Sequence, residues 1–210
     1  TDNLYNSFFF APDTEQAQPK PETTDSFDLG VRYRTGRLQA QLAGWYTKYK
    51  NRLATSYDPI LDETIFRNLG KVDKYGIDGS IAYQPTRNLL VYVFGSYLNS
   101  EIKDDVQVDT TSAGVPIFAE TAGKRESGSP VYTLGGRVQG TFGPLELGAQ
   151  VKRTGKRYIN DENVPVEDGG DIVWGATAPA YTVVDLDARY SLAHLGLEET
   201  YFQLNVTNLF

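Results

Sequence analysis

Few residues of this chain have the types and spacing that catalysis needs. Its 210 residues include one histidine and no cysteine, so neither a Ser-His-Asp triad nor a metal site built on histidine or thiolate is expected. The histidine, His194, lies in a short turn, where a solvated side chain is the simplest interpretation. We therefore expect no catalytic site, no metal site, no cofactor and no enzymatic activity.

Acidic residues cluster in the long polar segments, as Asp104-Asp105, Asp161-Glu162 and Glu167-Asp168. Carboxylates can bind Ca²⁺, but the spacing of an EF-hand loop is missing, and a solvated loop is the favoured interpretation. Gly169-Gly170 does not connect a strand to a helix, so a phosphate site is not indicated. The net charge of -7 argues against nucleic acid as a partner.

Arginine and aromatic residues in the same segments are the candidates for binding a ligand. Aromatic faces beside guanidinium groups suit a chelate or a sugar. Ordinary loop packing explains these residues equally well, so both interpretations stay open. The candidates are Arg157, Tyr158, Trp174, Tyr57 and Arg67.

Between the polar segments lie runs in which apolar and polar residues alternate one by one. This period of two residues is that of a β-strand. From Arg137 to Lys152, two such runs meet at Gly143-Pro144 and predict a hairpin. Each predicted strand has an apolar face, and the charges lie on the opposite face. The run from Leu89 to Ile102 is apolar on both faces, so its orientation stays open. The charged positions expected on the inner, polar face are Arg32, Asp78, Arg137, Asp185, Asp187 and Arg189.

Three regularities favour a membrane over a protein core as the environment of the apolar faces. The connections alternate between short and long, which is typical of a barrel with short periplasmic turns and long extracellular loops. No apolar face carries a charge in its middle, where a base costs about 2–4 kcal/mol in lipid. Aromatic residues lie at both ends of these faces, as Tyr33 and Tyr75 illustrate.

We therefore predict an all-β fold, an antiparallel up-and-down transmembrane β-barrel. About eight strands are expected over residues 25–210, with residues 1–24 as an extracellular loop. Two alternatives remain. One is a complete small barrel of about eight strands with a structural or adhesion role. The other is a soluble β-sandwich that binds carbohydrate, although the charged inner faces argue against it.

Three segments resemble the carboxy-terminal part of the barrel of TonB-dependent outer-membrane receptors. Lys20 to Tyr33, read as KPETTDSFDLGVRY, resembles a segment of that family that enters a barrel strand. Asn68 to Gly79 (NLGKVDKYGIDG) and Asn205 to Phe210 (NVTNLF) resemble two later segments. They occur in the family's order and extend over nearly the whole chain.

The resemblance implies an active transporter in the outer membrane of a Gram-negative-type cell. Members bind scarce external ligands such as a ferric siderophore, cobalamin or a sugar, and a plug domain couples the barrel to the TonB complex. The plug and the closing strand are not recognised in this sequence. Because such barrels have about 22 strands, we expect the chain to be a partial barrel, embedded in outer-membrane lipid.

Overall fold

One long antiparallel sheet dominates the computed structural model, which describes residues 21–58 and 63–209. The sheet has eight long strands. Each of them pairs with the long strand that follows it in the sequence. In order across the sheet they are β1 (Thr23–Thr35), β2 (Leu38–Lys50), β5 (Val72–Thr86), β6 (Leu89–Ile102), β9 (Tyr132–Phe142), β10 (Leu145–Thr154), β15 (Tyr181–Ser191) and β16 (Tyr201–Val206). Within the described residues, no helix is long and apolar enough to cross a membrane.

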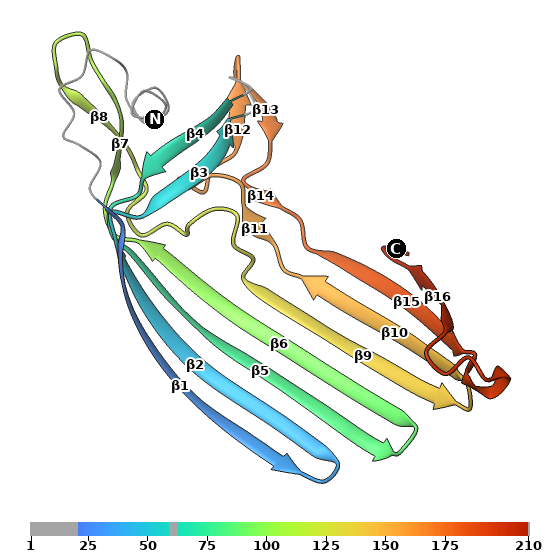
Figure 1. The fold of residues 1–210 in the computed structure, drawn as a ribbon. Helices are drawn as coiled ribbons and strands as arrows, with labels where there is room; N and C mark the ends of the chain where they lie inside the picture. Colours follow the sequence, from blue (N-terminus) through green and yellow to red (C-terminus); the bar gives the residue numbers. More distant parts are fainter. Residues whose placement is uncertain (1–20, 59–62, 210) are drawn as a thin grey trace.

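Short connections join the strands at one end of the sheet, as predicted (Figure 1). The β9–β10 turn contains Gly143, whose φ of 60° suits a residue without a side chain. The β15–β16 connection carries a short 3-10 helix, η1 (Ala193–Leu195), in which His194 is exposed. The sequence placed all of these connections at the same end, and the structure agrees.

The long connections at the other end contain short strands that the alternation did not predict. Hairpins form from β3 (Leu53–Asp58) with β4 (Glu63–Asn68), β7 (Val106–Thr110) with β8 (Pro116–Ala119), and β12 (Val166–Asp168) with β13 (Asp171–Trp174). A fourth pair joins β11 (Arg157–Tyr158) to β14 (Thr177–Ala178). We expected the strand after the Gly143-Pro144 turn to reach about Tyr158, but β10 ends at Thr154. Figure 1 shows β3–β4, β7–β8 and β12–β13 extending beyond the end of the main sheet.

The strand register resolves the orientation of β6, which its sequence left open. Directly paired residues of an antiparallel sheet lie on the same face. Val91 pairs with Val138 of the apolar face, and Tyr92 pairs with Arg137 of the polar face. Val93 and Tyr97 therefore belong to the apolar face. The side chains of β6 on the polar face include Leu90, Tyr92, Phe94 and Leu98.

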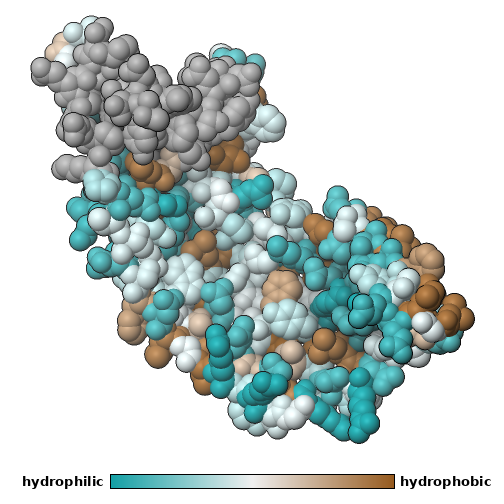
Figure 2. Space-filling view, viewed as in Figure 1, coloured by the Kyte–Doolittle hydropathy of each residue, from teal (hydrophilic) through white to brown (hydrophobic). Residues whose placement is uncertain are grey.

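The apolar face is largely uncovered. Phe27, Leu29 and Phe202 expose 67%, 70% and 70% of their surface. Figure 2 shows hydrophobic side chains at the surface over the β15–β16 end of the sheet. A soluble protein rarely exposes so large an apolar surface without a partner. The β-sandwich alternative is therefore not supported, since no second sheet covers this face among the described residues.

The sheet is open at both edges among the described residues. β1 pairs only with β2, and β16 pairs only with β15, so the eight strands do not close on themselves. The strands are also staggered, because the row of paired residues that starts at Thr35, the last residue of β1, ends at Val206, the last residue of β16. Such a stagger accompanies strand tilt in a barrel. The chain is therefore a partial barrel, and the complete small barrel is not supported.

Among the residues that the structure describes, the compact core lies at the end of the sheet that carries the hairpins. Leu69, Val72, Ile102 and Val106 are buried there, and Tyr49 and Ala54 pack against them. Along the rest of the sheet, the backbone ladders and the cross-strand side-chain pairs hold the strands together.

Candidate functional site

The polar face carries all six charged residues that the sequence placed there: Arg32, Asp78, Arg137, Asp185, Asp187 and Arg189. Arg137 and Asp187 form a bidentate ion pair, with Nη1–Oδ1 and Nη2–Oδ2 distances of 2.6 and 2.9 Å. The pair joins β9 to β15 across the intervening β10. It crosses above Gly148, where an added Cβ would lie 2.5 Å from the Asp187 carboxylate oxygens.

Large side chains lie flat along the same face because glycines face them on neighbouring strands. The Trp45 ring covers Gly76, where an added Cβ would lie 2.6 Å from a ring carbon. Trp45 Nε1 donates a hydrogen bond of 2.7 Å to Asp78. The Phe94 ring covers Gly135 in the same manner. These side chains therefore form a wall that keeps close to the backbone of the sheet.

Other groups on the polar face have separate partners. Arg189 stacks on the Tyr201 ring, with its guanidinium carbon 3.8 Å from the ring centroid. Asp185 accepts a hydrogen bond of 2.9 Å from the backbone N–H of Asn208. Arg32 borders a hollow of about 750 Å³ with Asp28 and Tyr92. The wall thus offers both charge signs and aromatic faces to whatever occupies the space in front of it.

The candidate ligand residues lie on three separate two-stranded ladders beyond the sheet. Arg157 and Tyr158 form β11 and are half-buried. Trp174 ends β13 and exposes 55% of its surface. The backbones of Tyr57 and Arg67 lie in β3 and β4, paired with Thr64 and Ala54. The backbones of the five candidates thus lie on separate ladders at one end of the sheet, and their role in a common site stays a prediction.

Sequence reasoning missed a buried charge network at the same end. Glu126 accepts hydrogen bonds of 3.1 and 3.0 Å from Arg52 Nε and Nη2, and its other oxygen lies 2.5 Å from Lys74 Nζ. Arg52 also contacts Glu22 at 3.2 Å. Burial disfavours the charged guanidinium, but Glu126 and Glu22 outweigh this effect and raise the pKa of Arg52 above its ordinary value. No local pattern signals this network, because its members are far apart in the sequence.

Three of the six acidic loop residues considered for Ca²⁺ bind the protein's own backbone. Asp104 accepts a hydrogen bond of 3.0 Å from the N–H of Lys71, and Asp105 accepts one of 2.9 Å from Ala122. Asp161 accepts one of 2.8 Å from Ser127. No group of three or more histidine, aspartate or glutamate side chains within residues 21–58 and 63–209 could hold a metal ion.

A charged rim borders the apolar face at the hairpin end. Lys103 lies 2.7 Å from Glu101 and 3.7 Å from Asp73, which also accepts a hydrogen bond of 2.9 Å from the Tyr46 hydroxyl. The hydrogen bond with Glu101 raises the pKa of Lys103 above its ordinary value. The rim follows directly beyond the aromatic row formed by Phe27, Tyr46 and Tyr75.

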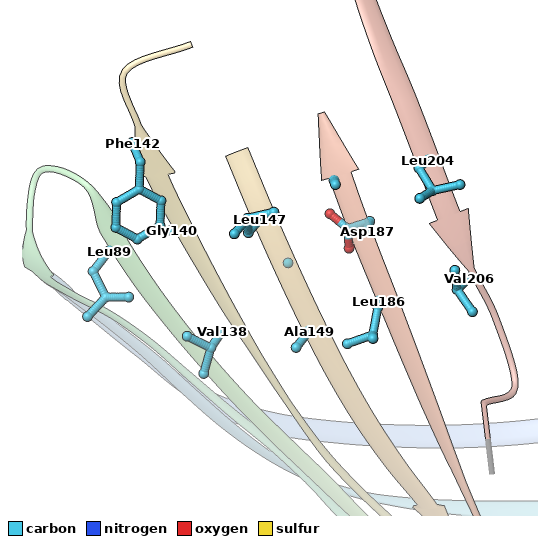
Figure 3. A pocket seen from close by; sticks show the side chains of 12 residues that line it. Leu89, Val138, Gly140, Phe142, Leu147, Ala149, Leu186, Asp187, Leu204 and Val206 are labelled. Carbon is cyan, nitrogen blue, oxygen red and sulfur yellow. The ribbon is translucent and has the colours of Figure 1, made fainter. Parts of the chain in front are cut away.

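The apolar face has a hollow of its own, of about 530 Å³ (Figure 3). Leu147, Leu186 and Leu204 contribute to its lining, and the small residues Gly140 and Ala149 give it depth. Asp187 borders it but directs its carboxylate to Arg137 on the opposite face. The side chains in the hollow are otherwise apolar, so it does not suit a charged chelate.

Comparisons with known proteins agree with this geometry. Residues 1–209 match the family model described as TonB dependent receptor-like, beta-barrel. The metal-pseudopaline receptor CntO of Pseudomonas aeruginosa is 29% identical over 193 residues, which cover 90% of this chain and 24% of CntO.

Two solved structures are similar in fold. The ferric yersiniabactin uptake receptor FyuA from Yersinia pestis matches with a TM-score of 0.62 and 20% identity, over 90% of this chain and 25% of FyuA. The copper transporter OprC matches with a TM-score of 0.63 and 18% identity, over 92% of this chain and 26% of OprC. The chain therefore spans about a quarter of the length of these relatives.

The family match extends over almost the whole chain, and it confirms the resemblance that the three sequence segments indicated. The open, staggered sheet with one apolar and one polar face is the part of the fold that this chain contributes. The chain belongs to the TonB-dependent receptor family, and its eight-stranded sheet is part of that family's β-barrel.

Proposed function

We propose that the full-length receptor lies in the outer membrane of a Gram-negative-type cell and takes up a scarce extracellular metal chelate such as a ferric siderophore. In this proposal the apolar face contacts lipid, the polar face lines the lumen, and the hairpin end faces the exterior. The observation that carries it is the division of one sheet into an exposed apolar face and a charged opposite face.

The class of ligand is proposed from the relatives and from the chemistry of the hairpin end. Metal-pseudopaline, ferric yersiniabactin and copper are named for three similar proteins. Arg157, Tyr158, Trp174, Tyr57 and Arg67 are the proposed contact residues, because aromatic and guanidinium groups suit an anionic chelate. Cobalamin and sugars are the alternative ligands that the family suggests.

The proposed partners are outer-membrane lipid and, through a plug domain elsewhere in the receptor, the TonB complex. Charged and aromatic groups of the polar face, such as Arg32 and Tyr92, would contact that plug. The TonB complex would supply the energy for release of the ligand into the periplasm.

An uptake assay tests this function. Cells that lack their own receptors for the tested chelates would express the full-length receptor and be offered zinc–pseudopaline, ferric yersiniabactin and ferric enterobactin, with cobalamin and maltodextrin as comparisons. We expect accumulation of a metal chelate that disappears when the TonB protein is deleted. A receptor that migrates as a folded, heat-modifiable outer-membrane protein but accumulates none of the chelates would contradict the proposal.

A further inference from the structure

The segment 121–127, which precedes β9, turns inward over the polar face at the hairpin end. Its Glu126 reaches Lys74 of β5, and the backbone N–H of Glu126 donates a hydrogen bond of 3.2 Å to Ser100 Oγ of β6. Lys74 and Ser100 are paired residues of the polar face. Glu126 therefore lies over the polar face of the sheet, in front of β5 and β6 at the hairpin end.

Backbone hydrogen bonds hold the same segment to the end of β6. The N–H of Ile102 donates to the carbonyl of Lys124, and the N–H of Gly123 donates to the carbonyl of Ile102, both at 2.8 Å. Arg125 donates from Nη2 to the carbonyl of Leu98 at 2.7 Å and also contacts the Asn99 side chain. Residues 123–125 are thus held beside the end of β6.

Two side chains of this segment are buried. Thr121 and Glu126 expose only 1% and 5% of their surface, whereas Phe118 on the preceding hairpin exposes 55%. A buried carboxylate persists only where partners compensate its charge, and Lys74 and Arg52 supply that compensation. Removal of Glu126 would leave two cations without their shared carboxylate.

We propose that Glu126 is a positioning residue that fixes the 121–127 segment as a rigid inner wall of the receptor's outer mouth. Glu126 lies over the polar face of β5 and β6 at the hairpin end, and its ion pairs hold the segment in one position. This inference rests on the proposed function, because it takes the polar face as the wall of a transport lumen.

Distance measurements between paired nitroxide labels test the proposal in the full-length receptor, with cysteines introduced at Ala122 and Arg87. Both side chains are exposed. The 14 residues of β6 separate the two ends of the sheet, a distance of roughly 45 Å. The comparison variants are Glu126→Gln and Lys74→Gln, with Glu120→Gln as the matched control, since Glu120 is exposed and carries the same charge. Heat-modifiable migration shows that each variant has folded.

We expect a single narrow distance distribution in the unsubstituted receptor and in Glu120→Gln, and one at least about twofold broader in the two other variants. Glu126→Gln leaves Lys74 without its carboxylate, and Lys74→Gln leaves one buried oxygen of Glu126 without its cation. A broad distribution in the unsubstituted receptor, or a narrow one in Glu126→Gln, would overturn the proposal. The measurement needs no ligand. A failed uptake assay with a narrow distribution would therefore refute the proposed function alone.

Discussion

An arginine placed on either face of β6 tests which face contacts lipid. Val93 lies on the apolar face with 53% of its surface exposed, between the row of Tyr83 and Val91 and the row of Tyr97. Val93→Arg therefore introduces a guanidinium into the band between the aromatic rows. An arginine near the bilayer midplane of a barrel costs about 2–4 kcal/mol, and this corresponds to a loss of about 30- to 900-fold in the folding equilibrium constant.

Ser96→Arg is the matched control on the same strand. Ser96 lies on the polar face and is paired across the strands with Asp78, whose carboxylate would form an ion pair with the new guanidinium. The free energy of unfolding should therefore change by less than about 0.5 kcal/mol, the range of ordinary surface substitutions. Both variants would be made in the full-length receptor.

Reversible denaturant unfolding of the receptor in lipid vesicles, followed by tryptophan fluorescence, measures both free energies of unfolding. We expect Val93→Arg to lower the midpoint and the free energy, and Ser96→Arg to leave them nearly unchanged. Equal destabilisation by the two variants, or a larger effect of Ser96→Arg, would refute the assignment of the apolar face to lipid.

Three further predictions follow from the same structure. Dissolved oxygen should accelerate the spin relaxation of nitroxide labels at Leu147 and Leu186, and water-soluble relaxation agents should not. The reverse result would place the apolar face in water. Asp187→Asn should destabilise the receptor by about 1–3 kcal/mol. A double-mutant cycle with Arg137→Gln should show coupling, whereas additive effects would mean that the pair across β10 contributes nothing. Trp174→Ala should weaken binding of whichever chelate the uptake assay identifies, measured by titration, and Trp174→Phe should restore it; equal affinities would remove Trp174 from the site.

The main sheet could be predicted from sequence because its pattern is local. Each long strand carries its own alternation, and the short turns separate the strands cleanly, as at Gly143-Pro144. The fold class, the family and the partial barrel are confirmed on this basis. The strand β6 was the exception, since both of its faces are apolar. Only the pairing of Val91 with Val138 assigned its orientation, and pairing is not a local property.

The hairpin end could not be predicted because its order comes from contacts between distant residues. Arg52 and Glu126 are separated by 74 positions, and neither stands in a recognisable motif. The short strands β7 and β12 contain too few residues for their alternation to be distinguished from a polar loop. The arrangement of the candidate site was the least predictable part, because its residues lie on separate ladders and the sequence does not specify how these ladders are arranged.

The charged residues of the polar face have different kinds of partner in the middle of the sheet and at its hairpin end. In the middle, Arg137 and Asp187 meet across Gly148, and the pair keeps close to the backbone. At the hairpin end, Lys74 projects toward Glu126 of a segment that comes from outside the sheet. The middle of the wall is thus lined by side chains of the sheet itself, whereas Glu126 lies over the sheet at the hairpin end. Under the proposed function, the middle of the sheet would contact the plug, and the hairpin end would border the entrance for the ligand.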